Sequence, residues 1–392
     1  MSRKIKLGII GIGNMGSSHA KLVKNGKCPD FEIVAIAEKN AARLEWAKEQ
    51  GFGENITYFE DAIAMLDSGL IEACLVAAPH YDHVPFTIAC IERGIHVMTE
   101  KPAGVYTKQV RQMNEASEKH PEVVFGLMFN QRTNCVYRKL RELVQSGKYG
   151  QIRRTNWLIT NWYRSQAYYN SGGWRASWKG EGGGVLLNQC PHQLDLWQWI
   201  CGMPVRVHAH MHFGKWHDIE VEDDVTAYVE YANGSTGVFI TSTGDASGSN
   251  RLEIQMDKAK FVVENDKLIM EEFEPSEPEF ARTNTKPFGG PKAQEVAVET
   301  DGQNPQHAGV MNAWADAILN GGQLGADGKE GINSLMLSNA MHLSGFLGKT
   351  IELPVDEDLY YEELMKRVET SRYVERESVF ADTSDSYAGT KK

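Results

Sequence analysis

The sequence has little of what metal-centred, disulfide-linked, membrane or nucleic-acid-binding proteins need. Its six cysteines are scattered and form no C-x-x-C pair, which predicts neither a zinc site nor a disulfide framework and favours a reducing cytoplasm. No apolar run reaches the roughly 20 residues of a membrane-spanning helix, so we expect neither a signal peptide nor a membrane partner. Lysine and arginine total 41 against 52 aspartate and glutamate, without a basic block. We therefore expect no nucleic-acid partner, because phosphate contacts need clustered positive charge.

A glycine motif near the N-terminus is the strongest positive signal. The apolar segment from Ile5 to Ile10 is followed at once by a G-x-G-x-x-G turn made of Gly11, Ile12, Gly13, Asn14, Met15 and Gly16. In dinucleotide-binding folds the first glycine permits a tight turn, the second lets the backbone approach a pyrophosphate, and the third lets a helix pack closely on the sheet. The free N–H groups and dipole at the start of that helix favour an anion. These six residues therefore predict a phosphate-binding turn.

An acidic residue supports a dinucleotide at this turn. The second apolar segment, Phe31 to Ala37, ends on Glu38, roughly 20 residues beyond the glycines, where a carboxylate can accept hydrogen bonds from an adenosine ribose. A carboxylate would repel the 2′-phosphate of NADP, so NAD is the expected cofactor. Lys39 weakens this preference, since a cation beside Glu38 could bind that phosphate. The alternative is an ordinary strand–turn–helix without a ligand.

The first part of the chain alternates between strand-like and helical segments. Continuous apolar runs such as Ile71 to Ala78 are typical of strands buried on both faces, and repeated strand–helix units predict a doubly wound parallel sheet. Residues 1–130 are therefore expected to form one α/β domain of the Rossmann type. Ligands bind beyond the carboxyl ends of such strands. The glycine turn, Glu38, Pro79-His80 and the triplet Glu100-Lys101-Pro102 all fall at such ends and should face one crevice.

Three of these motifs carry a family resemblance. The glycine turn, Ala78-Pro79 followed by His83, and Glu100-Lys101-Pro102 resemble the glucose–fructose oxidoreductase, inositol dehydrogenase and rhizopine-catabolism family (Gfo/Idh/MocA). The resemblance implies an NAD-binding Rossmann domain followed by an α/β domain whose open sheet commonly forms an oligomer interface. It implies cofactor contacts from Pro79, His83, Glu100 and Lys101. Lys101 is further implied to be catalytic, with a cis peptide bond to Pro102.

Residues 131–355 are expected to form the second domain, because the sequence pattern changes there. From Gln151 to Glu264, long alternating segments replace most of the helices, which predicts a large, mostly antiparallel open sheet. No run of helices would cover the far face of this sheet. We therefore expect a homodimer or homotetramer that buries it.

Several stretches of the second half are interpreted as surface features. Glu220 to Asp224 reads as a solvated acidic turn, and Glu271 to Pro291 as a long loop or flap. Residues 356–392 are expected to form a charged helix, Tyr360 to Tyr373, and a mobile tail from Phe380. Three histidines alternate on one strand without a carboxylate or cysteine at matching spacing, so a polar sheet face is favoured over a metal site; they are His208, His210 and His212.

The segment after the glycine triplet Gly182–Gly184 carries the other candidate catalytic residues. Pro191 suits the first turn of a helix, on which His192 and Asp195 share a face because they lie three residues apart. Many members of the family have aspartate where this sequence has Asn188. An amide can hold a hydroxyl but cannot accept its proton, so His192 is the expected base and Asn188 orients the hydroxyl. Asp195 either fixes the imidazole tautomer or belongs to a local network.

Aromatic and basic side chains are interleaved between residues 162 and 179. Aromatic faces can stack on sugar rings, and arginine or lysine can hydrogen-bond their hydroxyls. Core aromatics with exposed charges are the alternative, and we expect the set to divide evenly. Tyr163, Arg164, Trp174 and Arg175 are expected to bind substrate together with Lys101, Asn188 and His192. His307, at a helix start, could approach the substrate or serve in packing. The interleaved set is Trp162, Tyr163, Arg164, Tyr168, Tyr169, Trp174, Arg175, Trp178 and Lys179.

Together these residues predict an NAD-dependent dehydrogenase acting on a sugar or cyclitol. The first expectation is an uncharged pyranose, such as a glycoside or an anhydrosugar, oxidised at a secondary ring hydroxyl. The choice of carbon 3 rests on the family resemblance alone. A cyclitol comes second, because Asn188 departs from the inositol dehydrogenase pattern. Two alternatives stay open: a redox-assisted, NAD-dependent glycosidase, and an NAD-binding protein without catalysis.

Overall fold

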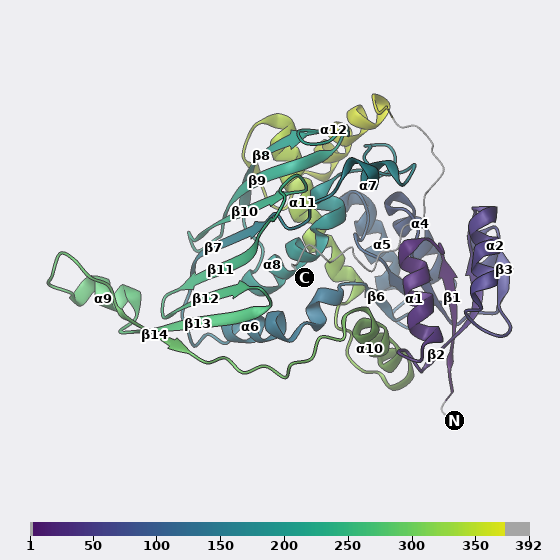
Figure 1. Ribbon diagram of the computed structural model, residues 1–392, viewed down its shortest axis with the longest axis horizontal. Helices are drawn as coiled ribbons and strands as arrows, with labels where there is room; N and C mark the ends of the chain where they lie inside the picture. The colour runs from purple at the N-terminus through teal and green to yellow at the C-terminus, as the bar shows by residue number, and fades with distance from the viewer. Residues whose placement is uncertain (1–2, 373–392) are drawn as a thin grey trace.

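Two β-sheets organise the chain, and a layer of helices separates them (Figure 1). The computed structural model describes residues 3–372. The first sheet lies in the purple and blue part of the ribbon and the second in the teal and green part, which confirms the predicted α/β class. The expected C-terminal tail from Phe380 lies outside the described residues. The helices that cover the second sheet on its side toward the first are α6 (Cys135–Gln145), α8 (Pro191–Cys201) and α11 (Gly331–Leu347).

Within residues 3–372 the first sheet has six strands, all parallel, in the order β3-β2-β1-β4-β5-β6. This order is the doubly wound arrangement that the sequence predicts. Every residue of β4 is buried, because helices cover both faces of the sheet. The strands are β1 (Ile5–Ile10), β2 (Phe31–Ala37), β3 (Thr57–Phe59), β4 (Ala73–Val76), β5 (His96–Thr99) and β6 (Phe125–Leu127).

Helices connect these strands in the predicted alternation, and their ends have local causes. Asn40 caps one of them by accepting a hydrogen bond from the backbone N–H of Arg43 at 3.0 Å. The same helix stops at Gly51, whose φ of 58° suits the left-handed cap conformation. The helices of this half are α1 (Asn14–Lys24), α2 (Ala41–Gln50), α3 (Ala62–Leu66), α4 (His80–Ile91) and α5 (Thr107–Lys119).

The second sheet has nine strands within the described residues, in the order β14-β13-β12-β11-β7-β10-β9-β8-β15. The β7–β10 pair is parallel and the other neighbours are antiparallel, so the prediction of a mostly antiparallel open sheet is confirmed. The strands are β7 (Ile152–Ile159), β8 (Arg206–Phe213), β9 (Glu222–Glu230), β10 (Thr236–Ser242), β11 (Asn250–Met256), β12 (Ala259–Glu264), β13 (Lys267–Glu274), β14 (Lys292–Val296) and β15 (Ile351–Glu352).

The interpretation of Glu271 to Pro291 as a loop is wrong for much of its length. β13 continues to Glu274, because its residues pair along the whole of β12, and β14 then adds at the sheet edge. Helix α9 (Glu277–Thr283) occupies the middle of the connection. The segment projects from the sheet (Figure 1). Prolines stand at 275 and 278, beside and within the start of α9, and proline and glycine recur at residues 287–291, where Phe288 is 88% exposed.

Helix α10 returns the chain to the first sheet. Trp314 on α10 is fully buried and its ring lies 5.2 Å from that of Phe31 on β2, so a helix expected in the second domain packs on the first. The sequence-based division at residues 130 and 355 stays a prediction. The remaining helical segments are η1 (Asn130–Thr133), α7 (Gln166–Asn170), the π-helical turn η2 (Val185–Gln189), α10 (Gln306–Asn320), η3 (Gly328–Glu330) and α12 (Glu357–Glu369).

The prediction of an oligomer concerns the face of the second sheet that points away from the first domain. Helices α6, α8 and α11 lie on the side of the sheet toward the first domain (Figure 1). On the opposite side Leu158, Tyr228 and Ile269 are each more than a third exposed. We expect a second copy to cover these side chains, giving a dimer or tetramer. Light scattering at micromolar protein measures the mass; a value of 43.8 kDa, that of one chain, would contradict the prediction.

Candidate functional site

The glycine turn has the shape that the sequence predicts. Gly11 has a φ of 84°, and a Cβ there would lie 2.6 Å from the carbonyl oxygen of Ala77. A Cβ on Gly16 would lie 1.9 Å from the carbonyl oxygen of Gly11, so helix α1 reaches its place only with glycine there. A Cβ on Gly13 would meet no atom within 4 Å. This open space faces the start of α1, where the backbone N–H groups suit a pyrophosphate, so the turn fits a dinucleotide.

Glu38 contacts the glycine turn directly. One carboxylate oxygen accepts the N–H of Ile12 at 3.0 Å and the other accepts the N–H of Asn40 at 2.9 Å. The carboxylate therefore sits beside the turn at the end of β2, as a ribose-binding acid should. Arg43, which the sequence reasoning missed, lies in the same place: its guanidinium donates to the carbonyl oxygen of Ile12 at 2.7 Å and stacks 3.4 Å from the Trp46 ring centre.

Glu100 and Lys101 extend from the carboxyl end of β5. Glu100 is 4% exposed and pairs with His19 of α1 at 2.6 Å, which joins this strand end to the helix behind the glycine turn. Burial by itself raises the pKa of Glu100, but the hydrogen bond from His19 and the charges of His19, His307 and Lys101 outweigh it and hold the pKa at about 2. Burial lowers the pKa of Lys101. The Lys101–Pro102 peptide bond is cis, as the resemblance implies.

The start of α4 supplies two histidines. Pro79 precedes its first turn, and His83 joins the carbonyl oxygens of Ala78 and Pro102 at 2.8 and 2.7 Å. His83 therefore braces the strand ends that flank the crevice. His80, which the sequence places with Pro79 at a strand end facing the crevice, is 5% exposed and reaches the carbonyl oxygen of Glu181 at 3.1 Å. This contact fixes the second domain's glycine-rich loop against the first domain.

A buried carboxylate holds the glycine triplet. Glu222 is 0% exposed and accepts the N–H of Gly184 at 2.9 Å and the N–H of Leu186 at 3.0 Å; its other neighbour is Nε2 of His342, at an ion-pair distance of 3.0 Å. Asp223 beside it is also 0% exposed. The interpretation of this acidic run as a solvated turn is therefore wrong. These carboxylates stay buried because backbone N–H groups and histidines satisfy their oxygens.

His192 lies one residue after the start of α8, as predicted. Its imidazole is 3% exposed, and among residues 3–372 neither ring nitrogen has a hydrogen-bond partner. Burial first, and then electrostatic interactions with Lys101 and His307, lower the pKa of His192 well below its usual value. The imidazole is therefore neutral near pH 7. A buried ring with both nitrogens unpaired is available to a ligand hydroxyl.

The local-network role of Asp195 is the one that the structure shows. Asp195 accepts two hydrogen bonds from Arg132 at 2.7 and 2.6 Å and one from Gln198 at 3.0 Å. Arg132 also pairs with Glu330 at 2.6 Å. This network fastens α8, and with it His192, to the segment that links the domains. Removing one partner of such a buried pair costs about 3–5 kcal/mol of stability.

Asn188 links the two domains at the site. It lies in the π-helical turn η2, a distortion frequent at functional sites. Its backbone carbonyl oxygen accepts a hydrogen bond from Lys101 Nζ at 2.7 Å, while its side-chain amide donates to Oε1 of Glu181. Glu181 is 2% exposed. The sequence reasoning missed this carboxylate, although it directly precedes the glycine triplet.

The aromatic segment divides between core and site. Trp162, Tyr169 and Trp178 are buried, whereas Tyr163 is 52% exposed. The Arg175 guanidinium lies 4.5 Å from the ring centres of both Tyr168 and Trp174 and donates to the Tyr168 hydroxyl at 2.7 Å. Burial is the largest cause of the lowered pKa of Lys101, and the positive charges of Arg175 and Arg164 lower it further. These two arginines are thus close to the catalytic candidates.

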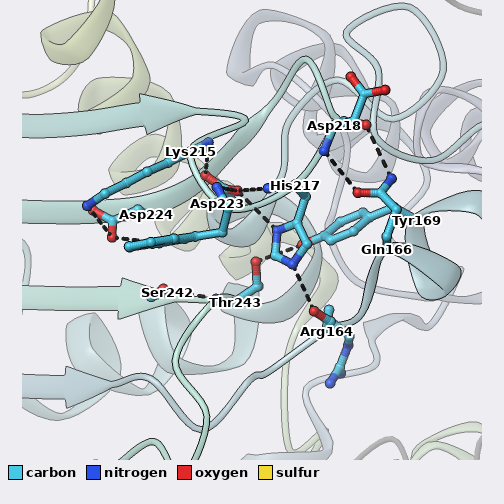
Figure 2. Close-up of polar contacts among 12 residues, drawn as sticks. Arg164, Gln166, Tyr169, Lys215, His217, Asp218, Asp223, Asp224, Ser242 and Thr243 are labelled. Carbon is cyan, nitrogen blue, oxygen red and sulfur yellow. Dashed lines mark hydrogen bonds and ion pairs between the residues drawn. The ribbon is translucent and has the colours of Figure 1, made fainter.

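A second polar cluster, centred on Asp223 and His217, holds the backbone of the aromatic segment at Arg164 (Figure 2). Asp223 accepts the N–H groups of Lys215 at 2.9 Å and Trp216 at 2.8 Å, and lies 3.0 Å from Nδ1 of His217. His217 reaches the carbonyl oxygen of Arg164 at 2.8 Å through its other ring nitrogen. A cavity of about 160 Å³ adjoins the cluster; Arg175 lines it, but Lys101 and His192 do not.

Two family models match the chain. The model described as an oxidoreductase family with an NAD-binding Rossmann fold matches residues 5–127, and the GFO/IDH/MocA C-terminal domain matches residues 137–262. The chain belongs to the Gfo/Idh/MocA family. Its first domain is accordingly the NAD-binding Rossmann fold of that family, and the predicted membership of the family is confirmed.

Relatives of this Gfo/Idh/MocA protein include named sugar and cyclitol dehydrogenases. Inositol 2-dehydrogenase of Corynebacterium glutamicum is 28% identical over 206 residues, 52% of this chain and 56% of that protein. D-glucoside 3-dehydrogenase of Escherichia coli is 28% identical over 253 residues, 59% of this chain and 68% of that protein. A similar fold is found in the crystal structure of the WlbA dehydrogenase from Bordetella pertussis in complex with NADH and UDP-GlcNAcA. The two structures superpose with a TM-score of 0.75 at 23% sequence identity, over 90% of this chain and 100% of that one. The chain thus spans little more than half the length of the first of these relatives.

The described residues do not form a metal site or a membrane-spanning helix. Among residues 3–372, no three histidine, cysteine or acidic side chains converge as metal ligands, and no helix there is long and apolar enough to cross a membrane. Of the three strand histidines, His208 contacts Thr350 at 3.2 Å and His212 pairs with Asp224 at 3.4 Å.

The position of Glu38 predicts a cofactor preference for this Gfo/Idh/MocA protein. We expect kcat/KM for NAD to exceed that for NADP by about tenfold or more, since each tenfold corresponds to about 1.4 kcal/mol and a 2′-phosphate would face the carboxylate. Glu38→Ala should narrow the ratio, whereas Glu45→Gln, at an exposed carboxylate of α2, should not. Steady-state rates measured with NAD and with NADP give this ratio for the wild type and both variants. A preference of the wild-type enzyme for NADP would contradict the assignment of Glu38 to the ribose.

Proposed function

We propose that this protein oxidises a secondary ring hydroxyl of a pyranose sugar to a ketone, with NAD as the hydride acceptor. The position of His192 carries the proposal. Its imidazole is buried, neutral and without a hydrogen-bond partner among the described residues. It lies close enough to Lys101 for the ammonium charge to lower its pKa. Both residues belong to the crevice at the carboxyl ends of the strands that carry the NAD-binding turn.

Each residue of this group has one task in the reaction. NAD, when bound, supplies the hydride acceptor. His192 takes the hydroxyl proton on a ring nitrogen, while the hydrogen on the same carbon leaves as hydride. The Lys101 ammonium donates a hydrogen bond to the reacting oxygen and stabilises the negative charge that develops there. Asn188 holds the same hydroxyl through its side-chain amide. The His19–Glu100 pair keeps the end of β5, and hence Lys101, in place.

The substrate side of the site supports a sugar. Tyr168 and Trp174 flank the guanidinium of Arg175, which offers flat aromatic faces together with hydrogen-bond donors. Arg164 and Arg175 both stack on the Tyr168 ring, at 5.0 and 4.5 Å from its centre. Arg175 also lies 3.9 Å from the Glu181 carboxylate, which offsets part of the positive charge that would bind a sugar phosphate. We therefore favour an uncharged glycoside or anhydrosugar. The similarity to D-glucoside 3-dehydrogenase supports carbon 3 as the position oxidised.

A panel of substrates tests this proposal. The protein is incubated with NAD and with glycosides, anhydrosugars and inositols, NADH formation is followed by absorbance, and NMR locates the new carbonyl. We expect NADH with pyranosides and a carbonyl at carbon 3. Activity on inositols alone would overturn the sugar assignment, and a carbonyl elsewhere in the ring would overturn only the position.

Inositol oxidation is the second candidate. The similarity to inositol 2-dehydrogenase favours it, and the same His192 and Lys101 chemistry would serve a cyclitol hydroxyl. The substrate panel separates the two candidates. Product release without net NADH would instead favour a redox-assisted glycosidase, and NAD binding without turnover on any polyol would favour a non-catalytic protein.

A further inference from the structure

Glu181 is a buried carboxylate that the reaction proposed above leaves without a role. It is 2% exposed and lies directly before the glycine triplet. One carboxylate oxygen accepts the N–H of Ala176 at 2.7 Å, and the other accepts the side-chain amide of Asn188 and lies 3.9 Å from Arg175 Nη1. An ionised carboxylate accepts hydrogen bonds and cannot donate them. The Asn188 side chain accordingly meets Glu181 with its nitrogen Nδ2, which donates the hydrogen bond.

This orientation decides what Asn188 offers to a substrate. An asparagine side chain has a donor end and an acceptor end. With the nitrogen committed to Glu181, the oxygen Oδ1 is the end left for a hydroxyl. Asn188 also holds Lys101 through its backbone carbonyl oxygen at 2.7 Å. Residue 188 thus stands between a buried carboxylate and the catalytic ammonium group, and both of its polar contacts bear on the site.

We propose that Glu181 is a positioning residue: it fixes the Asn188 amide so that Oδ1 accepts a hydrogen bond from the substrate hydroxyl and directs that hydroxyl to His192. This inference rests on the proposed function. The Glu181–Asn188 pair supplies the negative charge and the acceptor oxygen at two linked residues, where a single aspartate at position 188 would supply both. The His80 contact to the Glu181 carbonyl oxygen holds the pair against the first domain.

A reciprocal exchange of the two side chains tests the inference. Glu181→Gln leaves the Asn188 amide facing a second amide, and two amides can pair in either orientation. We therefore expect kcat to fall about tenfold or more, which corresponds to a rise of about 1.4 kcal/mol in the activation free energy. Asn188→Asp places two carboxylates in contact and should also lower kcat, because they repel or share a proton. The double variant Glu181→Gln/Asn188→Asp restores one amide and one carboxylate, so its kcat should recover above that of either single variant.

Two measurements separate this role from a structural one. Glu220→Gln is the matched control. The Glu220 carboxylate accepts the N–H of Trp178, a residue three positions before Glu181 in the chain, but does not contact Asn188. The kcat of this variant should equal that of the wild type. The NAD dissociation constant and melting temperature identify misfolded variants. Should Glu181→Gln fail to fold, Asn188→Asp still decides, since unchanged or increased kcat in that variant contradicts the inference.

The outcomes distinguish this inference from the proposed function. A wild-type protein without turnover on the whole substrate panel would overturn both. An active wild type whose Glu181→Gln variant folds and keeps its kcat, or whose double variant shows no recovery over the single ones, would overturn the inference alone and leave Glu181 as a cap on the turn that contains Ala176.

Discussion

Replacing His192 with alanine is expected to lower kcat by about 10²–10⁴, the usual contribution of a positioned base. NAD affinity should be unchanged, because the glycine turn and Glu38 lie on other elements. Burial keeps the His192 imidazole uncharged at neutral pH, so one of its ring nitrogens can accept a proton close to Lys101. Steady-state kinetics and NAD titration of the variant measure both effects. His210→Ala is the control, because that histidine is exposed on β8.

The pH profile gives a second test of the same residue. Because the pKa of His192 lies below its ordinary value, the base stays deprotonated as the pH falls past about 6.5, the usual histidine pKa. The acidic limb of kcat/KM should therefore begin below that pH and should be lost in the alanine variant. A limb above pH 7 that persists in His192→Ala would assign it to another group.

Replacing Lys101 with methionine is the second change with a large expected effect. Methionine keeps the length and apolar stem of the side chain but removes the ammonium group that we propose stabilises the reacting oxygen. We expect kcat to fall by about 10²–10³, the cost of removing one such donor, while the protein folds normally. Lys108→Met is the matched control, because Lys108 forms an exposed ion pair with Asp358. Full turnover in both His192→Ala and Lys101→Met would exclude these residues from the mechanism.

Local patterns predicted the parts of the molecule that depend on local physics. Apolar runs, the glycine spacing and the acidic residue after β2 gave the first sheet and its cofactor turn, because each of these features acts within a few residues of the chain. Helix α8 begins at Pro191 as expected, and His192 therefore lies on its first turn. The strands of the second sheet also followed from their alternation, whose period matches a sheet with one buried face.

Partners distant in sequence account for most of what was missed. Arg132 and Asp195 are 63 residues apart, and His80 and Glu181 are 101 apart, so no window of sequence shows that they meet. In the sequence alone, the acidic residues 220–224 look like a solvated turn, because the backbone N–H groups and the histidine that pair with the Glu222 carboxylate are distant along the chain. Glu222 is buried because the backbone of the glycine triplet and His342 lie against it.

Glu181 is the exception, because a signal for it was present. It lies seven residues before Asn188 and directly before the glycines. An asparagine at the position of a catalytic carboxylate raises the question of where the negative charge has gone. A glutamate on the adjoining turn was a candidate answer that sequence spacing alone could have raised.

The transfer of one hydride from a ring carbon to NAD is the central claim, and isotopic labelling tests it most directly. A methyl glucoside deuterated at carbon 3 is incubated with the protein and NAD, and the reduced cofactor and the sugar are analysed by mass spectrometry and NMR. The account predicts deuterium in the reduced cofactor, in an amount equal to the 3-keto sugar formed, and a loss of both in His192→Ala. Cleavage of the glycosidic bond without accumulation of reduced cofactor would contradict it.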